Sequence, residues 1–129
     1  MARILVLEDD PHCLGTLFAI LHEVSQHEFV VCESVEAAMG ELDASDYNLV
    51  ICDLHIRRSR RQGRHFLWHL RSKDENLPVI VLTGMEYVAV HIRKGQTFYE
   101  GYRISRQVKK PIDYVELLRH IDEVIGGGP

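Results

Sequence analysis

Five short apolar runs punctuate this sequence, and each is followed by a longer segment of mixed polarity. The runs at residues 3–7, 48–53 and 78–83 are apolar throughout their centres. Continuous apolar runs of this length are typical of strands covered on both faces. The runs at 28–33 and 104–108 are more polar, as strands at the edge of a sheet often are. The pattern therefore predicts three central strands and two edge strands.

Between and after these runs, apolar residues recur at helical spacing. The first helix is expected over residues 11–24, with Asp10 as its N-cap. Ser34 is the expected cap of the second helix, and Asp113 with Glu116 resembles a capping box before the last. The residues predicted to face the core from the second, third and last helices are Val35, Ala38, Met39 and Leu42; Phe66, Leu67 and Leu70; and Tyr114, Leu117, Leu118, Ile121 and Ile125.

Strands and helices alternate along the chain, so the fold class is α/β with a parallel sheet. Placing the three apolar strands at the centre gives the order 2-1-3-4-5, the flavodoxin-like doubly wound sheet with helices on both faces. A chain of 129 residues is expected to form one domain, over 1–125, followed by a Gly-rich tail or linker at 126–129.

Composition narrows the function classes. The formal net charge of −4 argues against a general nucleic-acid or membrane-surface binder. No apolar run is long enough to cross a bilayer, and no signal peptide is evident. The three cysteines, Cys13, Cys32 and Cys52, lie in largely apolar settings with no zinc-site spacing, which indicates reduced thiols. A cytoplasmic protein is predicted.

Acidic and polar residues gather where the predicted strands end. Glu8 and Asp9 follow the first strand, Asp53 ends the third and Thr83 ends the fourth. In such a sheet, ligands bind beyond the carboxyl ends of the strands. Two carboxylates about 4 Å apart repel by roughly 4 kcal/mol at an effective dielectric near 20, so the cluster needs a cation, a shared proton or an ammonium group. All-oxygen ligands favour Mg²⁺, and Lys110 can supply the ammonium.

At this point the chain resembles the receiver domain of response regulators, the phosphorylatable module of two-component signalling. The resemblance covers nearly the whole chain. It is carried by residues 4–11 (Ile-Leu-Val-Leu-Glu-Asp-Asp-Pro), by Asp53-Leu54, by residues 78–83, and by Lys110-Pro111 before an amphipathic helix.

The resemblance implies roles for individual residues. Asp53 would be the phosphoacceptor, and Mg²⁺ would be held by Glu8, Asp9, Asp53 and the backbone carbonyl of His55. Lys110, which often precedes a cis peptide bond in this family, would pair with a phosphate oxygen. Thr83 would move toward the phosphate and report its presence.

The resemblance also implies the biological setting. The phosphoryl donor would be a sensor histidine kinase or a phosphotransfer protein of a bacterial two-component system. The recipient of the signal would be a downstream protein or an output domain, with a homodimer as a further possibility and no direct contact with nucleic acid or membrane. The chain would be a signalling receiver that assists its own phosphorylation and dephosphorylation, and not an enzyme.

Two segments depart from the family pattern. The loop after Asp53 is strongly basic, and two interpretations stay open for it: a solvated loop, or a contact for an anion or an acidic partner. In residues 84–106, only Tyr87, Val88 and Ile92 indicate a helix, and Gln107 stands where the family has an aromatic switch residue. Tyr99 and Tyr102 are possible substitutes. The basic residues of the loop are Arg57, Arg58, Arg60, Arg61 and Arg64.

Competing interpretations concern the function and a few side chains. A receiver-like protein-interaction module that takes no phosphate, and a Mg-dependent phosphatase of the haloacid-dehalogenase type, are the alternatives. His65 and His69 have a spacing that can bind a metal, but a surface position is expected. His12 is expected in the first turn of a helix, with a place in the crevice as the alternative. Trp68 is expected to be half-buried by packing.

Overall fold

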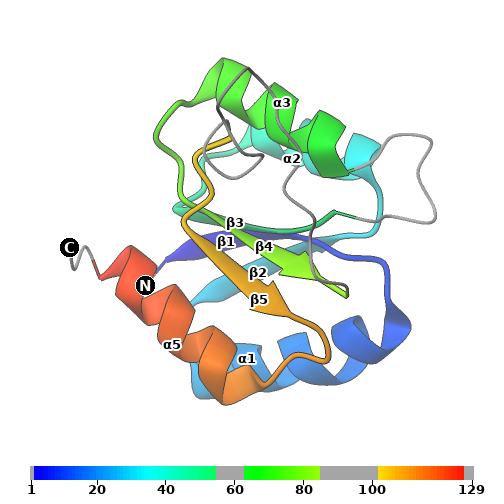
Figure 1. Cartoon of the computed structure of the whole chain (residues 1–129), viewed down its shortest axis with the longest axis vertical. Coiled ribbons are helices and arrows are strands. Elements are labelled where there is room, and N and C mark those ends of the chain that lie inside the picture. Colours follow the sequence, from blue (N-terminus) through cyan, green and yellow to red (C-terminus); the bar gives the residue numbers. More distant parts are fainter. Residues whose placement is uncertain (1, 55–62, 85–101, 127–129) are drawn as a thin grey trace.

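The computed structural model describes residues 2–54, 63–84 and 102–126, and its centre is one parallel sheet (Figure 1). The sheet order is β2-β1-β3-β4-β5, and every neighbouring pair is parallel. The predicted order is therefore confirmed, with the more polar second and fifth strands at the edges. The strands are β1 (Arg3–Leu7), β2 (Glu28–Cys32), β3 (Leu49–Asp53), β4 (Val79–Thr83) and β5 (Arg106–Lys109).

Helices cover both faces of the sheet, as predicted. In Figure 1, α1 and α5 lie on one face, and α2 and α3 lie on the other. Residues 11–24 are helical as expected, but a π-helical stretch precedes α1 inside that range. The helical segments are η1 (Cys13–Leu17), α1 (Phe18–Val24), α2 (Val35–Ala44), α3 (Gly63–Lys73) and α5 (Tyr114–Ile125). The helix indicated by Tyr87, Val88 and Ile92 lies outside the described residues.

The predicted caps are present. The side chain of Ser34 accepts a hydrogen bond from the N–H of Ala37, and Asp113 accepts from the N–H groups of Val115 and Glu116. The hydrogen bond from the N–H of Asp113 to Glu116 that would complete the expected capping box is not found among the described residues, and the Glu116 carboxylate lies 3.6 Å from the His120 ring on the next turn of α5. These caps satisfy helix N–H groups that have no partner within the helix.

Two buried clusters, one on each face, hold the helices to the sheet. Every residue of β3 and β4 is buried, because both strands are covered on both sides. β5 begins two residues later than the predicted strand at 104–108, and Ile104 instead packs against the cluster under α2 and α3. No helix in the described ranges is long and apolar enough to cross a membrane.

Two predictions about buried side chains are wrong. Trp68 is 60% exposed, since Phe66, Leu67 and Leu70 fill the face of α3 that meets the sheet and leave residue 68 on the outer face. Tyr114 is 41% exposed, because it is the first residue of α5 and extends beyond the packed stripe. Helical periodicity predicts the direction of a side chain but not where the neighbouring element ends.

Candidate functional site

Three carboxylates converge at the carboxyl edge of the sheet. One oxygen each from Glu8, Asp9 and Asp53 lie within 4.8 Å of one another, and no other such group of metal-ligating side chains occurs among the described residues. All three residues are buried, with 0%, 8% and 4% of their surface exposed. The pairing of β1 with β3 brings Leu7 beside Cys52, so the residues that follow in each strand meet at this edge. The predicted cluster is therefore formed.

The turn after β1 places Glu8 and Asp9 in this position. The Oε1 atom of Glu8 accepts a hydrogen bond of 2.9 Å from the N–H of Asp10. Asp10 in turn accepts at Oδ1 from the N–H of His12, as expected of an N-cap, and its backbone carbonyl accepts from Leu14. These bonds fix the chain between the strand and the helix, so both acids stay at the edge.

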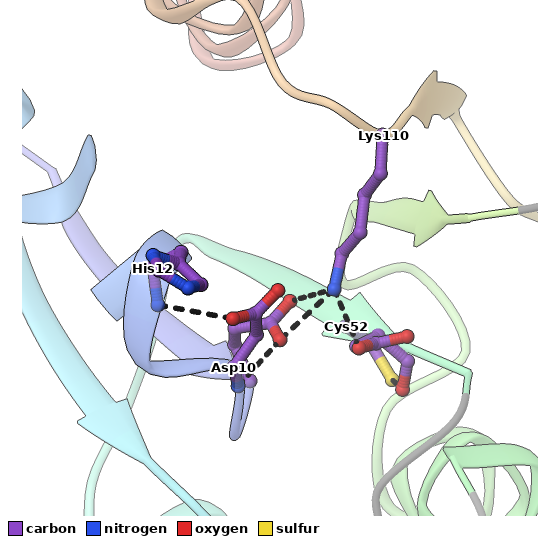
Figure 2. Close-up of polar contacts among 6 residues, drawn as sticks. Asp10, His12, Cys52 and Lys110 are labelled. Carbon is purple, nitrogen blue, oxygen red and sulfur yellow. Dashed lines mark hydrogen bonds and ion pairs between the residues drawn. The ribbon is translucent and has the colours of Figure 1, made fainter. Parts of the chain in front are cut away.

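Lys110 reaches the cluster from the opposite side. Its Nζ donates to Oδ2 of Asp53 at 2.9 Å and to Oε1 of Glu8 at 3.0 Å, and Figure 2 shows the side chain extending from the end of β5 to these carboxylates. The backbone N–H of Lys110 donates to the carbonyl of Thr83 at 2.7 Å, and the bond to Pro111 is cis. The predicted ammonium is thus in contact with two of the three acids.

Burial and charge alter the protonation of this group. Burial raises the pKa of Glu8 to about 7; the hydrogen bond from Lys110 opposes the shift and the charge of Asp53 adds to it. Burial alone would lower the pKa of Lys110, but its hydrogen bonds to Glu8 and Asp53 outweigh that effect and raise it above the ordinary value. Lys110 therefore stays cationic, and Glu8 is the group of this pair that can exchange a proton near neutral pH.

One carboxylate oxygen of the cluster accepts no hydrogen bond. Oε2 of Glu8 is buried and accepts no hydrogen bond, although Nζ of Lys110 lies 2.8 Å from it in an ion-pair contact. Lys110 therefore meets Oε2 as an opposite charge, and no hydrogen-bond donor to this oxygen is found among the described residues. A buried carboxylate oxygen without a hydrogen bond is costly and is well placed to bind a cation.

A cavity of about 440 Å³ opens onto the cluster. Asp53 and Lys110 line it, together with Gly84 after β4. His12 both lies in the first helical turn and lines this cavity, so its two interpretations hold together. Thr83 is 2% exposed at the end of β4 and is not among the described residues that line the cavity. A small polar ligand can therefore approach Asp53 directly.

Gly63 is a residue of this region whose role the sequence did not reveal. It begins α3, and its N–H donates to the carbonyl of Leu54 at 3.2 Å. A Cβ at this position would collide with the backbone oxygen of Asp53 and lie 2.8 Å from Cα of Leu54. Only glycine permits this approach. A glycine between a basic loop and an apolar helical stripe is the signal in the sequence that could have identified this residue.

Other predicted residues lie apart from the site. His69 pairs through Nε2 with Asp43 at 2.9 Å, and the His65 ring lies 6.0 Å from that of Trp68, so the two histidines have separate partners. Gln107 is exposed on β5. Tyr102 is partly buried against the core under α3. His55, Tyr99 and residues 57–61 lie outside the described residues.

Sequence comparison identifies related proteins. A family profile described as "Response regulator receiver domain" matches residues 4–122. The transcriptional regulatory protein BasR of Escherichia coli (strain K12) is 38% identical over 87 residues, which are 65% of this chain and 36% of BasR. The response regulator protein FleR of Pseudomonas aeruginosa is 33% identical over 82 residues, which are 64% of this chain and 17% of FleR. The chain thus matches 36% of the length of BasR and 17% of the length of FleR.

Solved structures share the fold. The receiver domain of NtrX from Brucella abortus superposes with a TM-score of 0.81 at 20% identity and covers 97% of this chain and 99% of that one. The chemotaxis protein CheY4 of Vibrio cholerae gives a TM-score of 0.79 at 17% identity, with 96% and 98% covered. At these identities the likeness establishes the sheet order and the layers.

Proposed function

This chain belongs to the response regulator receiver domain family of two-component signalling, and on that premise we propose that Asp53 accepts a phosphoryl group from a phosphohistidine. The observation that carries the proposal is the contact of Lys110 Nζ with Asp53 Oδ2 at 2.9 Å, at the edge of an open cavity. A carboxylate can act as a nucleophile when it lines a cavity that the reactant can enter and its product is stabilised by a nearby cation. Asp53 and Lys110 meet both conditions.

The transfer itself needs few groups. An oxygen of Asp53 attacks phosphorus, the bond from phosphorus to the histidine nitrogen breaks, and the departing imidazole keeps the electron pair and takes a proton from water. An aspartyl phosphate and a neutral histidine result. Lys110, already hydrogen-bonded to Asp53, turns to an oxygen of the new phosphoryl group and offsets its charge.

Mg²⁺ is the proposed cofactor, and the residues present fit it. The donors are all carboxylate oxygens, as a hard cation prefers, and Oε2 of Glu8 lacks a hydrogen bond. Asp9 and Asp53 would be the direct ligands, with Glu8 beside them; the backbone carbonyl of His55 is expected to add a ligand from outside the described residues. When bound, the ion supplies neutralisation of the charge on the phosphoryl oxygens.

Thr83 is the proposed reporter of phosphorylation. It ends β4 beside the site, and the N–H of Lys110 donates to its carbonyl. A phosphoryl group adds about −1.5 to −2 charges. Hydrogen bonds to a charged group contribute roughly 1.5–3 kcal/mol each, so Thr83 and Lys110 together would bias two conformations by roughly 3–6 kcal/mol. Inverting a 1:99 population requires about 5.5 kcal/mol, so this bias gives a partial to nearly full shift of the population.

The family membership supports the wider setting of the proposal. The donor would be a sensor histidine kinase or a phosphotransfer protein in the cytoplasm of a bacterium, and the recipient a downstream protein or an output domain. BasR and FleR each extend well beyond the matched segment, which agrees with an output carried elsewhere. The chain would act as a signalling receiver and turn over no substrate of its own.

The test is phosphorylation by a small donor. The protein is incubated with acetyl phosphate and Mg²⁺, and intact mass spectrometry records addition of one phosphoryl group. We expect modification of the native protein, none of Asp53→Asn, and none when EDTA removes divalent ions. Asp43→Asn is the matched control, because Asp43 is an aspartate on α2 away from the cavity, and it should be modified as the native protein is.

Three results would overturn the proposal. Absence of modification in the native protein would favour an interaction module that takes no phosphate. Modification that persists in Asp53→Asn would place the acceptor elsewhere. Continuous hydrolysis of a phosphate ester would favour a phosphatase.

A further inference from the structure

Three residues of α3, Arg64, His65 and Trp68, form an aromatic and basic surface together with the partly buried Tyr102, and we call it the α3 surface. These residues line a second cavity of about 460 Å³ that shares no lining residue with the one at the carboxylates. Trp68 is 60% exposed, and the His65 ring lies 6.0 Å from it. Exposing a tryptophan to water costs free energy that a binding partner would recover.

Positive charge is concentrated in the sequence of α3 and of the segment that precedes it. Residues 54–73 contain seven of the 15 lysines and arginines and no aspartate or glutamate. The remainder of the chain contains all 19 acidic residues. α3 is therefore a basic element on an otherwise acidic protein, and its local field attracts negatively charged groups although the whole molecule is negative.

The cations of α3 differ in what they already bind. Arg71 donates to four backbone carbonyls, and Lys73 pairs with Asp43. Arg64 is exposed, and within the described ranges no carboxylate pairs with it. It lies one helical turn before Trp68, on the same face. A cation and a large aromatic side chain are thus presented together to the outside.

We propose that the α3 surface docks an acidic segment of a partner protein, with one apolar side chain of that segment packed on Trp68. Carboxylates of the segment pair with Arg64. Aromatic anchors beside arginine are typical of residues that dominate binding energy at interfaces. A nucleic acid fits less well, because its repeated phosphates would also meet the acidic remainder of the chain.

This docking does not depend on the phosphoacceptor role of Asp53. It requires only the fold of α3, which the buried stripe of Phe66, Leu67 and Leu70 fixes against the sheet. Figure 1 shows α3 with α2 on the face of the sheet opposite α1 and α5. A partner can therefore reach it without entering the cavity at the carboxylates.

The single tryptophan of the chain provides the measurement. Trp68 fluorescence is recorded while a short peptide rich in Glu and Asp, with one central Phe, is added. We expect a saturable blue shift that weakens as salt is raised. A peptide with Lys in place of the acids should give no shift, and one with Ser in place of Phe should bind at least about tenfold more weakly.

Variants of the protein test which residues form the contact. Because Trp68→Ala removes the only tryptophan, binding to the variants is measured by the fluorescence anisotropy of a labelled peptide. Arg64→Gln and Trp68→Ala should each weaken binding, the latter at least about tenfold. The matched controls are Arg119→Gln and Val115→Ala on α5, since Arg119 and Val115 are each 60% exposed, and both should bind as the native protein does. Far-ultraviolet circular dichroism confirms that each variant is folded.

Other occupants would be recognised by the same measurements. If an oligothymidylate shifts Trp68 fluorescence at lower concentration than the acidic peptide, the surface binds nucleic acid and the proposal is wrong. If sedimentation shows self-association that Trp68→Ala abolishes, the occupant is a second copy of this chain, and the proposal is again wrong. Peptide binding that is unchanged by both Arg64→Gln and Trp68→Ala also overturns it.

Discussion

Two partly buried cations, Lys110 and Arg71, each connect segments of the chain at opposite ends of this molecule, and they bind different kinds of partner. Lys110, at the carboxyl edge of the sheet, binds the charged side chains of Glu8 and Asp53. Arg71, on α3, binds neutral backbone carbonyls: its Nε donates to Tyr102 at 2.8 Å, and its guanidinium nitrogens donate to Asp74, Leu77 and Arg103 at 2.8–3.2 Å. Both bring together segments that are distant in sequence.

The partners decide what each cation can do. Glu8 can exchange a proton near neutral pH. By our proposal the site also binds Mg²⁺ and takes a phosphoryl group, so the contacts of Lys110 can be exchanged. The carbonyls around Arg71 cannot change their charge, and burial lowers the pKa of Arg71 without removing its proton, because a guanidinium stays ionised. Lys110 belongs to a site that changes state, whereas Arg71 is a permanent tie between α3, the turn before β4 and the chain entering β5.

The largest effect on stability is expected from removing the Arg71 side chain. Arg71→Ala should lower the free energy of unfolding by roughly 3–5 kcal/mol, because two of its acceptors, Tyr102 and Leu77, are partly buried and each hydrogen bond to a charged group contributes roughly 1.5–3 kcal/mol. Urea unfolding followed by circular dichroism measures the change. Arg71→Lys should recover little of the loss, since one ammonium cannot reach all four carbonyls. A lysine variant as stable as the native protein would contradict this account.

The next effect is a dependence of stability on pH that comes from Glu8. Its pKa rises from 4.5 to about 7 on folding, so between these values the folded protein binds more protons than the unfolded chain. The free energy of unfolding therefore decreases as pH rises through that window, by about 3 kcal/mol from this group. The measurement is the difference between the native protein and Glu8→Gln across the window, in EDTA. A difference that stays constant with pH would refute the assignment.

Removing Lys110 should have a smaller effect that itself depends on pH. The hydrogen bond from Lys110 lowers the pKa of Glu8, so Lys110→Ala should raise it further and move the stability loss to higher pH. We expect a cost of about 2 kcal/mol at pH 8 and less near pH 5.5, where a protonated Glu8 relieves the repulsion with Asp53. Repeating the pH series on the variant measures both. An equal cost at both pH values would show that the ammonium acts by packing alone.

The smallest effect is expected at the surface cluster of Asp43, His69 and Lys73, which, like the site around Lys110, combines acidic and basic side chains. Hydrogen bonds from Lys73 and His69 hold the pKa of Asp43 below its ordinary value. The side chains of Asp43 and Lys73 are exposed to solvent, and that of His69 is partly exposed. Asp43→Asn should leave urea unfolding unchanged within error, at low and at high salt, because water screens exposed pairs. A clear loss of stability would mean that charge in itself, and not burial, explains the first three predictions.

Much of the fold was predictable because strands and helices are encoded locally. The apolar centres of residues 3–7, 48–53 and 78–83 predicted the central strands, and the polar character of 28–33 and 104–108 predicted the edges. The gathering of Glu8 and Asp53 followed from parallel strands, whose carboxyl ends meet at one edge. The π-helical stretch before α1 carried no comparable pattern.

By itself, then, the sequence determined the sheet order, the two helical layers and the acidic edge, since these depend on periodicities of two and 3.6 residues and on strand direction. Only the tertiary structure decided that Lys110 contacts both Glu8 and Asp53, that Gly63 presses on the backbone of Asp53, and that Trp68 faces outward. The physical reason is that contacts between distant segments depend on how helices are set on the sheet. A shift of one residue in that packing buries a side chain or exposes it, and the periodic pattern stays the same.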